Sequence, residues 1–220
     1  MIISSSGHRE IEQLIIQNVP RDALAACEDA YYGGDEKGRI NSAKFALGHR
    51  PSAAGHVKHF YINEAFHEAL NVHGADPSPL RGTRLVVGRL GIFNIVRLNV
   101  PGHKWVNLNR SATRKKLAEL NQTIEQKYVQ GDFFASDCMV IRGTIFILGV
   151  GDGVDENGIA QLTQVMVALP AADMKSWLYR STMADVLVLY DQVNVAVQPD
   201  KALPKLKKQP TKKTGDDQGN

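Results

Sequence analysis

The chain has 220 residues, of which 43% are hydrophobic and 22% charged, a composition typical of folded globular proteins and unlike that of disordered or membrane proteins. No apolar run reaches the roughly 18 residues of a membrane span, and the N-terminal sequence lacks the charged-then-apolar order of a signal peptide, so we expect a soluble, cytoplasmic protein. Only Cys27 and Cys138 are present, which is too few for a disulfide framework.

The first third of the sequence predicts helices. Apolar residues recur at helical spacing in Gly7 to Asn18, and further helices are expected over Pro20 to Tyr32, Glu36 to about Leu47 and about Ser52 to Val72. We expect the pair Gly33-Gly34 to end the second of these helices. The loop from Ala75 to Pro79 marks the end of a helical subdomain, residues 1–76.

The next segment, residues 77–198, predicts strands and two helices. Strands are expected over Thr83 to Leu90, Ile92 to Val100 and Lys104 to Asn109, followed by a helix that Ser111 caps and that ends near Gly131. Two more strands, Met139 to Val150 and Ile159 to Leu169, flank a hairpin signal at Asn157-Gly158. Pro170 is expected to open a last helix to about Tyr190, with a break at Ser181-Thr182. The order predicts an α+β fold: a helical N-terminal part, then a mainly antiparallel sheet with two covering helices on one face.

The positive charge is concentrated in two segments. Residues 199–220 contain six Lys and three Asp, which accounts for the whole formal net charge of +3. This segment is rich in Pro and Lys and poor in apolar residues, so we expect a disordered basic tail. The second segment runs from Pro77 to Ala118 and contains nine Lys or Arg residues and no Asp or Glu.

The acid-free segment carries the main functional hypothesis. Trp105 and Asn107 fall on one face of the expected strand, a combination suited to stacking on bases, although a buried or subunit-contact Trp is an alternative. Basic residues crowd the first turns of the following helix, where the helix dipole disfavours cations unless an anion binds there, and a solvated face is the other interpretation. The expected nucleic-acid contacts are Arg84, Arg97, Trp105, Asn107, Arg110, Arg114, Lys115 and Lys116.

Other motifs are weaker. Five of the seven His lie between His49 and His73, but His56 and His67 are eleven residues apart, about 16 Å along a helix at 1.5 Å per residue, too far to share one ion. His67-Glu68 lacks the second His of the zinc-protease motif. The glycine-rich segment from Gly149 to Gly158 lacks the spacing of a phosphate or calcium loop and reads as a polar hairpin. We therefore expect no metal and no cofactor.

Three functional hypotheses remain. The first is a nucleic-acid-binding or nucleic-acid-associated accessory protein without evident catalytic activity, binding DNA or RNA. The second is an adaptor or subunit that binds a protein partner, or a second copy of itself, through the Trp105 face or apolar helix surfaces. The third is a hydrolase centred on His56, Glu64 and His67.

Overall fold

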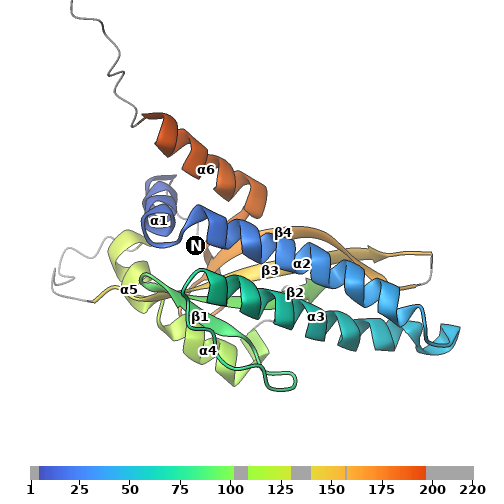
Figure 1. Cartoon of the computed structure of the whole chain (residues 1–220). Helices are drawn as coiled ribbons and strands as arrows, with labels where there is room; N and C mark the ends of the chain where they lie inside the picture. Colours follow the sequence, from blue (N-terminus) through green and yellow to red (C-terminus); the bar gives the residue numbers. More distant parts are fainter. Residues whose placement is uncertain (1–4, 102–108, 130–139, 157, 197–220) are drawn as a thin grey trace, which may run out of the picture.

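The computed structural model describes residues 5–101, 109–129, 140–156 and 158–196. Four helical elements come first, namely α1 (Ser5–Asn18), α2 (Arg21–Ser42), the 3-10 helix η1 (Leu47–His49) and α3 (Arg50–Val72). Then follow β1 (Val87–Leu90), β2 (Phe93–Pro101), α4 (Ala112–Glu119), α5 (Gln122–Ile124), the π-helical turn η3 (Glu125–Val129), β3 (Gly143–Val154), β4 (Ala160–Pro170), β5 (Trp177–Thr182) and α6 (Met183–Ala196). The predicted α+β class, with helices preceding the sheet, is confirmed (Figure 1).

The five strands form one mixed sheet in the order β1-β2-β3-β4-β5. Three of the neighbouring pairs are antiparallel, and β2 and β3 are parallel, with Phe93 opposite Gly143 and Val100 opposite Val150. A parallel pair needs a crossover connection, and here α4 lies within that connection. The sheet is thus mainly antiparallel, as expected, with one parallel step at its centre.

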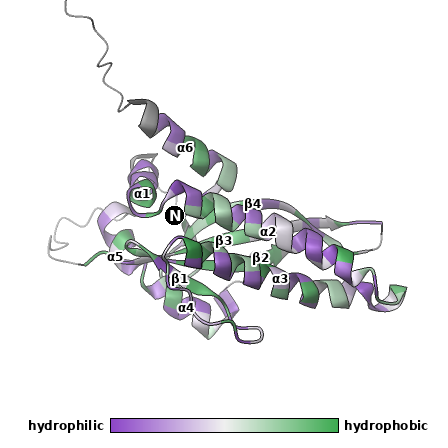
Figure 2. Ribbon diagram, in the orientation of Figure 1, coloured by the Kyte–Doolittle hydropathy of each residue, from purple (hydrophilic) through white to green (hydrophobic). Residues whose placement is uncertain are grey.

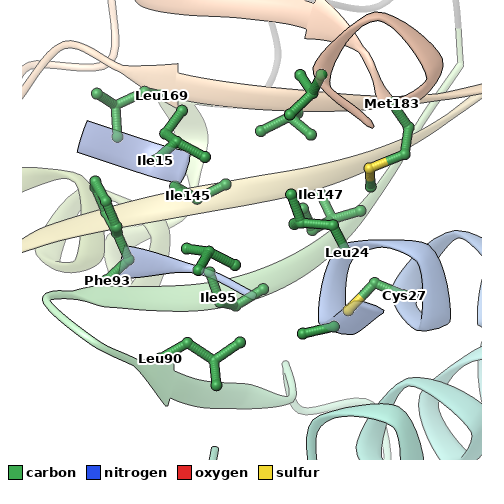
Figure 3. Close-up of a cluster of buried hydrophobic side chains, with 14 of the residues drawn as sticks. Ile15, Leu24, Cys27, Leu90, Phe93, Ile95, Ile145, Ile147, Leu169 and Met183 are labelled. Carbon is green, nitrogen blue, oxygen red and sulfur yellow. The ribbon is translucent and has the colours of Figure 1, made fainter. Parts of the chain in front are cut away.

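The sheet is covered on both faces, which corrects the expectation that helices cover one face only. On one face, Ile95 of β2 and Ile147 of β3 share a core with side chains of α1, α2, α3 and α6 (Figure 3). On the other face, Val96, Leu98 and Phe146 pack in a second cluster that Leu117 of α4 joins. Both faces of the central strands are therefore apolar, and Figure 2 shows these strands as largely hydrophobic between helices of mixed character.

Helix α2 does not end at Gly33-Gly34 as predicted but continues to Ser42. A Cβ atom at Gly34 would lie 2.7 Å from Cα of Ile62, and one at Gly38 would lie 2.7 Å from Cα of Lys58. These glycines therefore let α2 and α3 cross at close range, and they stay in the helix because packing outweighs their low helix propensity. The separate helix expected from Glu36 to Leu47 is replaced by the end of α2 and by η1.

The helix expected from Pro170 is wrong in its first half. Pro170 ends β4, the chain turns with Ala171 N donating to Ser176 O at 2.9 Å, and β5 pairs antiparallel with β4. Helix α6 begins only at Met183, at the break expected near Ser181-Thr182. Thr182 Oγ1 accepts from the backbone N of Asp185 at 3.1 Å and donates to that carboxylate, an N-terminal cap that fixes where the helix starts.

The connection from α4 to β3 is held by one buried amide. The side chain of Asn121 donates to the carbonyl oxygens of Thr144 at 3.2 Å and Pro170 at 2.8 Å, and accepts from Thr144 N at 2.6 Å. This clamp joins the end of α4 to β3 and β4 and fixes the position of α4 against the sheet. The third strand expected from Lys104 to Asn109 lies mostly outside the described residues, as does the Lys-rich segment after residue 198. Within the described residues no helix has the length and apolarity to cross a membrane.

Candidate functional site

Arg84 and Arg114, thirty residues apart in sequence, line the same cavity. The cavity has a volume of about 600 Å³ and lies where the loop before β1 meets the N-terminus of α4. Five of its lining residues are polar and two are apolar, and we call it the basic cavity: Thr83, Arg84, Leu85, Val87, Ser111, Thr113 and Arg114. The structure thus brings together two of the cations that the sequence indicated.

The N-terminus of α4 forms one wall of the basic cavity. Ser111 has an extended backbone, with φ −87° and ψ 123°, and its side chain accepts from the backbone N of Arg114. The first turn contains no acidic residue. Because the N-terminal end of a helix carries a partial positive charge and free N–H groups, an anion is stabilised at this wall.

The side chain of Arg114 is partly buried and incompletely bonded. Its Nε is buried and has no hydrogen-bond partner among the described residues. Burial also lowers the pKa of Arg114 from its ordinary value, although an arginine still stays charged at neutral pH. A buried donor without a partner costs about 1–3 kcal/mol, so an acceptor that entered the basic cavity would relieve an existing penalty.

The remaining basic residues of the predicted set differ in accessibility. Arg110, Lys115 and Lys116 are exposed at the start of α4, beside the basic cavity. Trp105 and Asn107 lie outside the described residues, so the proposed stacking face has no structural description.

Arg97 is not on the surface. It lies on the face of β2 that packs against α3, and only 2% of its area is exposed. Its Nη2 donates to Nδ1 of His59 at 2.8 Å and to the carbonyl oxygen of His59 at 3.0 Å. Nε donates to Oδ1 of Asn63, and Nη1 donates to Oδ1 of Asn99 at 3.1 Å. Arg97 therefore positions His59 from the protein interior and is not accessible to a ligand.

The charge of Arg97 has no opposite charge beside it. No ion pair of Arg97 occurs among the described residues. The hydroxyl of Tyr31 lies near the guanidinium, but burial raises the pKa of Tyr31 to about 12, so this group is neutral. Among the described residues, neutral dipoles of Tyr31, His59, Asn63 and Asn99 solvate the cation, which leaves a net positive charge inside the protein.

The contacts of Arg97 determine the state of His59. A guanidinium only donates, so Nδ1 of His59 must accept, and in the neutral ring the proton then lies on Nε2. Burial, Arg97 and His56 together lower the pKa of His59, which keeps the ring neutral. Nε2 lies 3.2 Å from Nδ2 of Asn63, which is itself a donor because Oδ1 of that amide faces Arg97. The cluster therefore has more donors than acceptors.

A second cavity adjoins the basic cavity at Thr83. It has a volume of about 390 Å³, lies along the first half of α3, and we call it the aromatic cavity: Ser52, Gly55, His56, His59, Phe60 and Thr83. Sequence analysis did not predict that His59 and Phe60 line a cavity. The sequence did contain two neighbouring rings on one predicted helix, His59 and Phe60. No nearby residue indicated that the loop before β1 would pack beside them.

A third cavity, of about 350 Å³, lies over a buried ion pair between α2 and α3. Lys58 Nζ lies 2.6 Å from Oδ1 of Asp35 and also donates to Ala160 O, while Arg39 Nε lies 3.1 Å from Oδ2 of Asp35. Both charged groups of this pair are therefore satisfied within the protein.

The residues of the hydrolase hypothesis lie along α3. His56 and Glu64 are exposed, His67 is partly buried, and Nδ1 of His56 lies 3.0 Å from Ser52 O. Within the described parts of the chain, no group of three or more His, Cys, Asp or Glu side chains is arranged to hold a metal ion.

Comparisons with protein-family models, with curated proteins and with solved structures found no match to this chain.

Proposed function

We propose that this protein binds nucleic acid through the basic cavity and the exposed cations at the start of α4. The observation that carries the proposal is the meeting of Arg84 and Arg114 at a helix N-terminus, with the Nε of Arg114 buried and without a partner in the part of the chain that the structure describes. A phosphate supplies what this site lacks, namely a negative charge and several acceptor oxygens.

The surroundings of the basic cavity suit a polyanion better than a single small anion. Arg110, Lys115 and Lys116 are exposed within four residues of Arg114, and the segment from Pro77 to Ala118 contains no acidic residue, the next acid on this helix being Glu119. A row of cations around one phosphate site matches successive phosphates along a backbone. Such contacts hold the strand without reading its sequence, which is the role of an accessory protein.

The test is the salt dependence of binding by the full-length chain. Replacing Arg84 and Arg114 together by Gln should weaken binding to every oligonucleotide sequence and lower the slope of log affinity against log salt by about 1.4 to 1.8, the value for two lost phosphate contacts. Arg9→Gln, an exposed residue of α1 outside both cavities, is the matched control. The Lys-rich C-terminal segment is present in all variants, so its contribution cancels.

The thermal stability of the same variants separates a binding role from a structural one. Arg114 lies in the first turn of α4, so removing its charge relieves a repulsion of about 0.3–1 kcal/mol with the helix dipole, and Arg84 is an exposed loop residue. The melting temperature should therefore stay level or rise slightly. A double variant that melts lower and still binds polyanions like the parent would assign Arg84 and Arg114 to structure and refute the proposal.

An adaptor function is the second candidate, and an exposed apolar turn favours it. Ile40, Phe45 and Leu47 are all exposed around the connection between α2 and α3, at the end of the helical pair that projects past the sheet (Figure 1). Exposed apolar residues gathered on one tip are typical of a protein contact. Sedimentation analysis of the parent and of Phe45→Ser/Leu47→Ser tests this function, because loss of a defined oligomer in the variant alone would support it.

A further inference from the structure

The basic cavity and the aromatic cavity are neighbours, since both are lined by Thr83, and we call the two together the depression. The cations belong to one half, with Arg84 and Arg114, and the rings belong to the other half, with His56, His59 and Phe60. A ligand that fills both must carry an anionic part directly beside a flat part. A nucleotide unit, with its phosphate and its base, has this order.

Phe60 is the exposed ring of the aromatic cavity. It is 44% exposed, although a large apolar side chain on a helix beside a core is usually buried. Its ring and that of His59 are nearly perpendicular, with centroids 5.7 Å apart and an angle of 73° between the planes, so the two rings do not stack on each other. The exposed part of the Phe60 ring is accessible to a flat partner.

The polar groups of the aromatic cavity favour a base over an apolar side chain. The hydroxyls of Ser52 and Thr83 and the imidazole of His56 provide polar groups around the ring of Phe60, whereas Nδ1 of His59 is already bonded to Arg97. No carboxylate is among the described residues that line this cavity. Arg97 donates to both Nδ1 and the carbonyl oxygen of His59 from the interior, so the imidazole is positioned before any ligand arrives.

We infer that the aromatic cavity takes an unpaired base, so that the protein binds single-stranded nucleic acid with one phosphate in the basic cavity and the adjoining base on Phe60. This inference rests on the proposed function and names its substrate class. In a duplex the bases are paired and stacked inside the helix, whereas a single strand can turn a base outwards onto an aromatic side chain.

The test compares Phe60→Ala, Phe60→Tyr and the control Tyr32→Ala in the full-length chain. Tyr32 is an aromatic residue of α2 that is 45% exposed and lines neither half of the depression. Affinity is measured by fluorescence anisotropy with a labelled single-stranded DNA, a single-stranded RNA of the same sequence and the corresponding DNA duplex. Phe60→Ala should weaken single-strand binding by about 5- to 100-fold, the effect of removing one stacking ring, and should leave duplex affinity unchanged.

The conservative variant and the salt slope separate stacking from charge. Phe60→Tyr should retain most of the single-strand affinity, Tyr32→Ala should bind like the parent, and none of these variants should change the salt slope. A difference in affinity between the single-stranded DNA and the single-stranded RNA shows which sugar the protein prefers, and the inference holds for either. Equal weakening of single-strand and duplex binding by Phe60→Ala overturns it.

Failure of this inference is distinguishable from failure of the proposed function. If Phe60→Ala binds single strands like the parent while the Arg84/Arg114 variant loses affinity, the phosphate surface stands and the base site is refuted. If neither variant changes binding, both are refuted. An unchanged melting temperature of Phe60→Ala, expected for so exposed a side chain, confirms that the comparison is made between folded proteins.

Discussion

Two cations are buried between the α2/α3 pair and the sheet, and their charges are balanced in different ways. Lys58 lies 2.6 Å from Asp35, whose other oxygen accepts from Arg39, so its charge is balanced locally. Arg97 is surrounded by His59, Asn63 and Asn99, which are neutral. The two residues occupy similar depths, since 8% of Lys58 and 2% of Arg97 is exposed.

The difference separates a structural charge from one that can act at a distance. A balanced pair has little field outside its immediate surroundings, whereas an unbalanced buried cation raises the potential of the surface above it. Arg97 contacts His59, and His59 lines the aromatic cavity. The uncompensated charge therefore lies behind the depression where we propose that a polyanion binds.

The largest effect is expected from breaking the balanced pair. Lys58→Met keeps the length of the side chain but leaves the carboxylate of Asp35 buried with Arg39 alone, so we expect the free energy of unfolding to fall by about 3 kcal/mol. Urea denaturation measures this loss. The double variant Asp35→Leu/Lys58→Met should recover most of it, and a double variant as unstable as the single one would show that Lys58 contributes through packing instead.

The next effect concerns the close crossing of α2 and α3 that places both cations. Gly34→Ala pushes a methyl group into the backbone of Ile62 and should cost about 2 kcal/mol through overpacking. Gly33→Ala is the matched control, because nothing lies within 4 Å of a Cβ there, and it should gain about 0.5–1 kcal/mol from better helix propensity. Equal effects of the two variants in thermal unfolding would contradict the close crossing.

A smaller loss is expected when the unbalanced cation is removed. Arg97→Met leaves four neutral acceptors without a donor, but it also removes the cost of burying an unpaired cation and strands no opposite charge. We therefore expect a net cost of about 1–2 kcal/mol, less than for Lys58→Met. The affinity of Arg97→Met for a single-stranded oligonucleotide should also decrease. The double variant Asp35→Leu/Lys58→Met should bind the same oligonucleotide like the parent. A larger destabilisation by Arg97→Met than by Lys58→Met would invalidate the distinction between the two cations.

The burial of Arg97 also shows where sequence analysis reached its limit. In β2, Ile95, Arg97 and Asn99 alternate with Val96, Leu98 and Val100, and a polar residue in such a pattern indicates a solvent-facing side. Here that side is covered, because His59 and Asn63 of α3 provide the acceptors that allow a cation to be buried. A partnership between residues more than thirty positions apart leaves no local signal.

Where the governing interaction is local, prediction from sequence succeeded. The predicted cap at Ser111 begins α4, and the strands predicted on either side of Asn157-Gly158 are β3 and β4. The sequence also shows directly that the segment containing Arg84 and Arg114 has no acidic residue. Strand β5 was missed because its pairing with β4 overrides the helical reading of the segment after Pro170. The aromatic cavity was missed because it forms only when the loop at Thr83 meets α3.

The smallest expected effect is a pH dependence that reports on the contact between Arg97 and His59. Burial, then the charges of Arg97 and His56, lower the pKa of His59 in the folded protein. The unfolded chain takes up this proton near the ordinary pKa of about 6.5, so it binds more protons than the folded protein as the pH falls from about 7. Stability from the neutral ring is fully present above that range and is lost on acidification through the lower, folded pKa.

His59→Gln tests this dependence because the amide can still accept from Arg97 but does not titrate. Other acidic and basic groups contribute equally to both proteins, so the difference between their unfolding free energies at pH 5, 6, 7 and 8, measured in urea, isolates the imidazole. We expect the stability of the variant to fall less steeply between pH 7 and pH 5 than that of the parent. Parallel curves would mean that His59 titrates alike in the folded and unfolded states, and the unbalanced charge of Arg97 would then have no influence on the ring that lines the aromatic cavity.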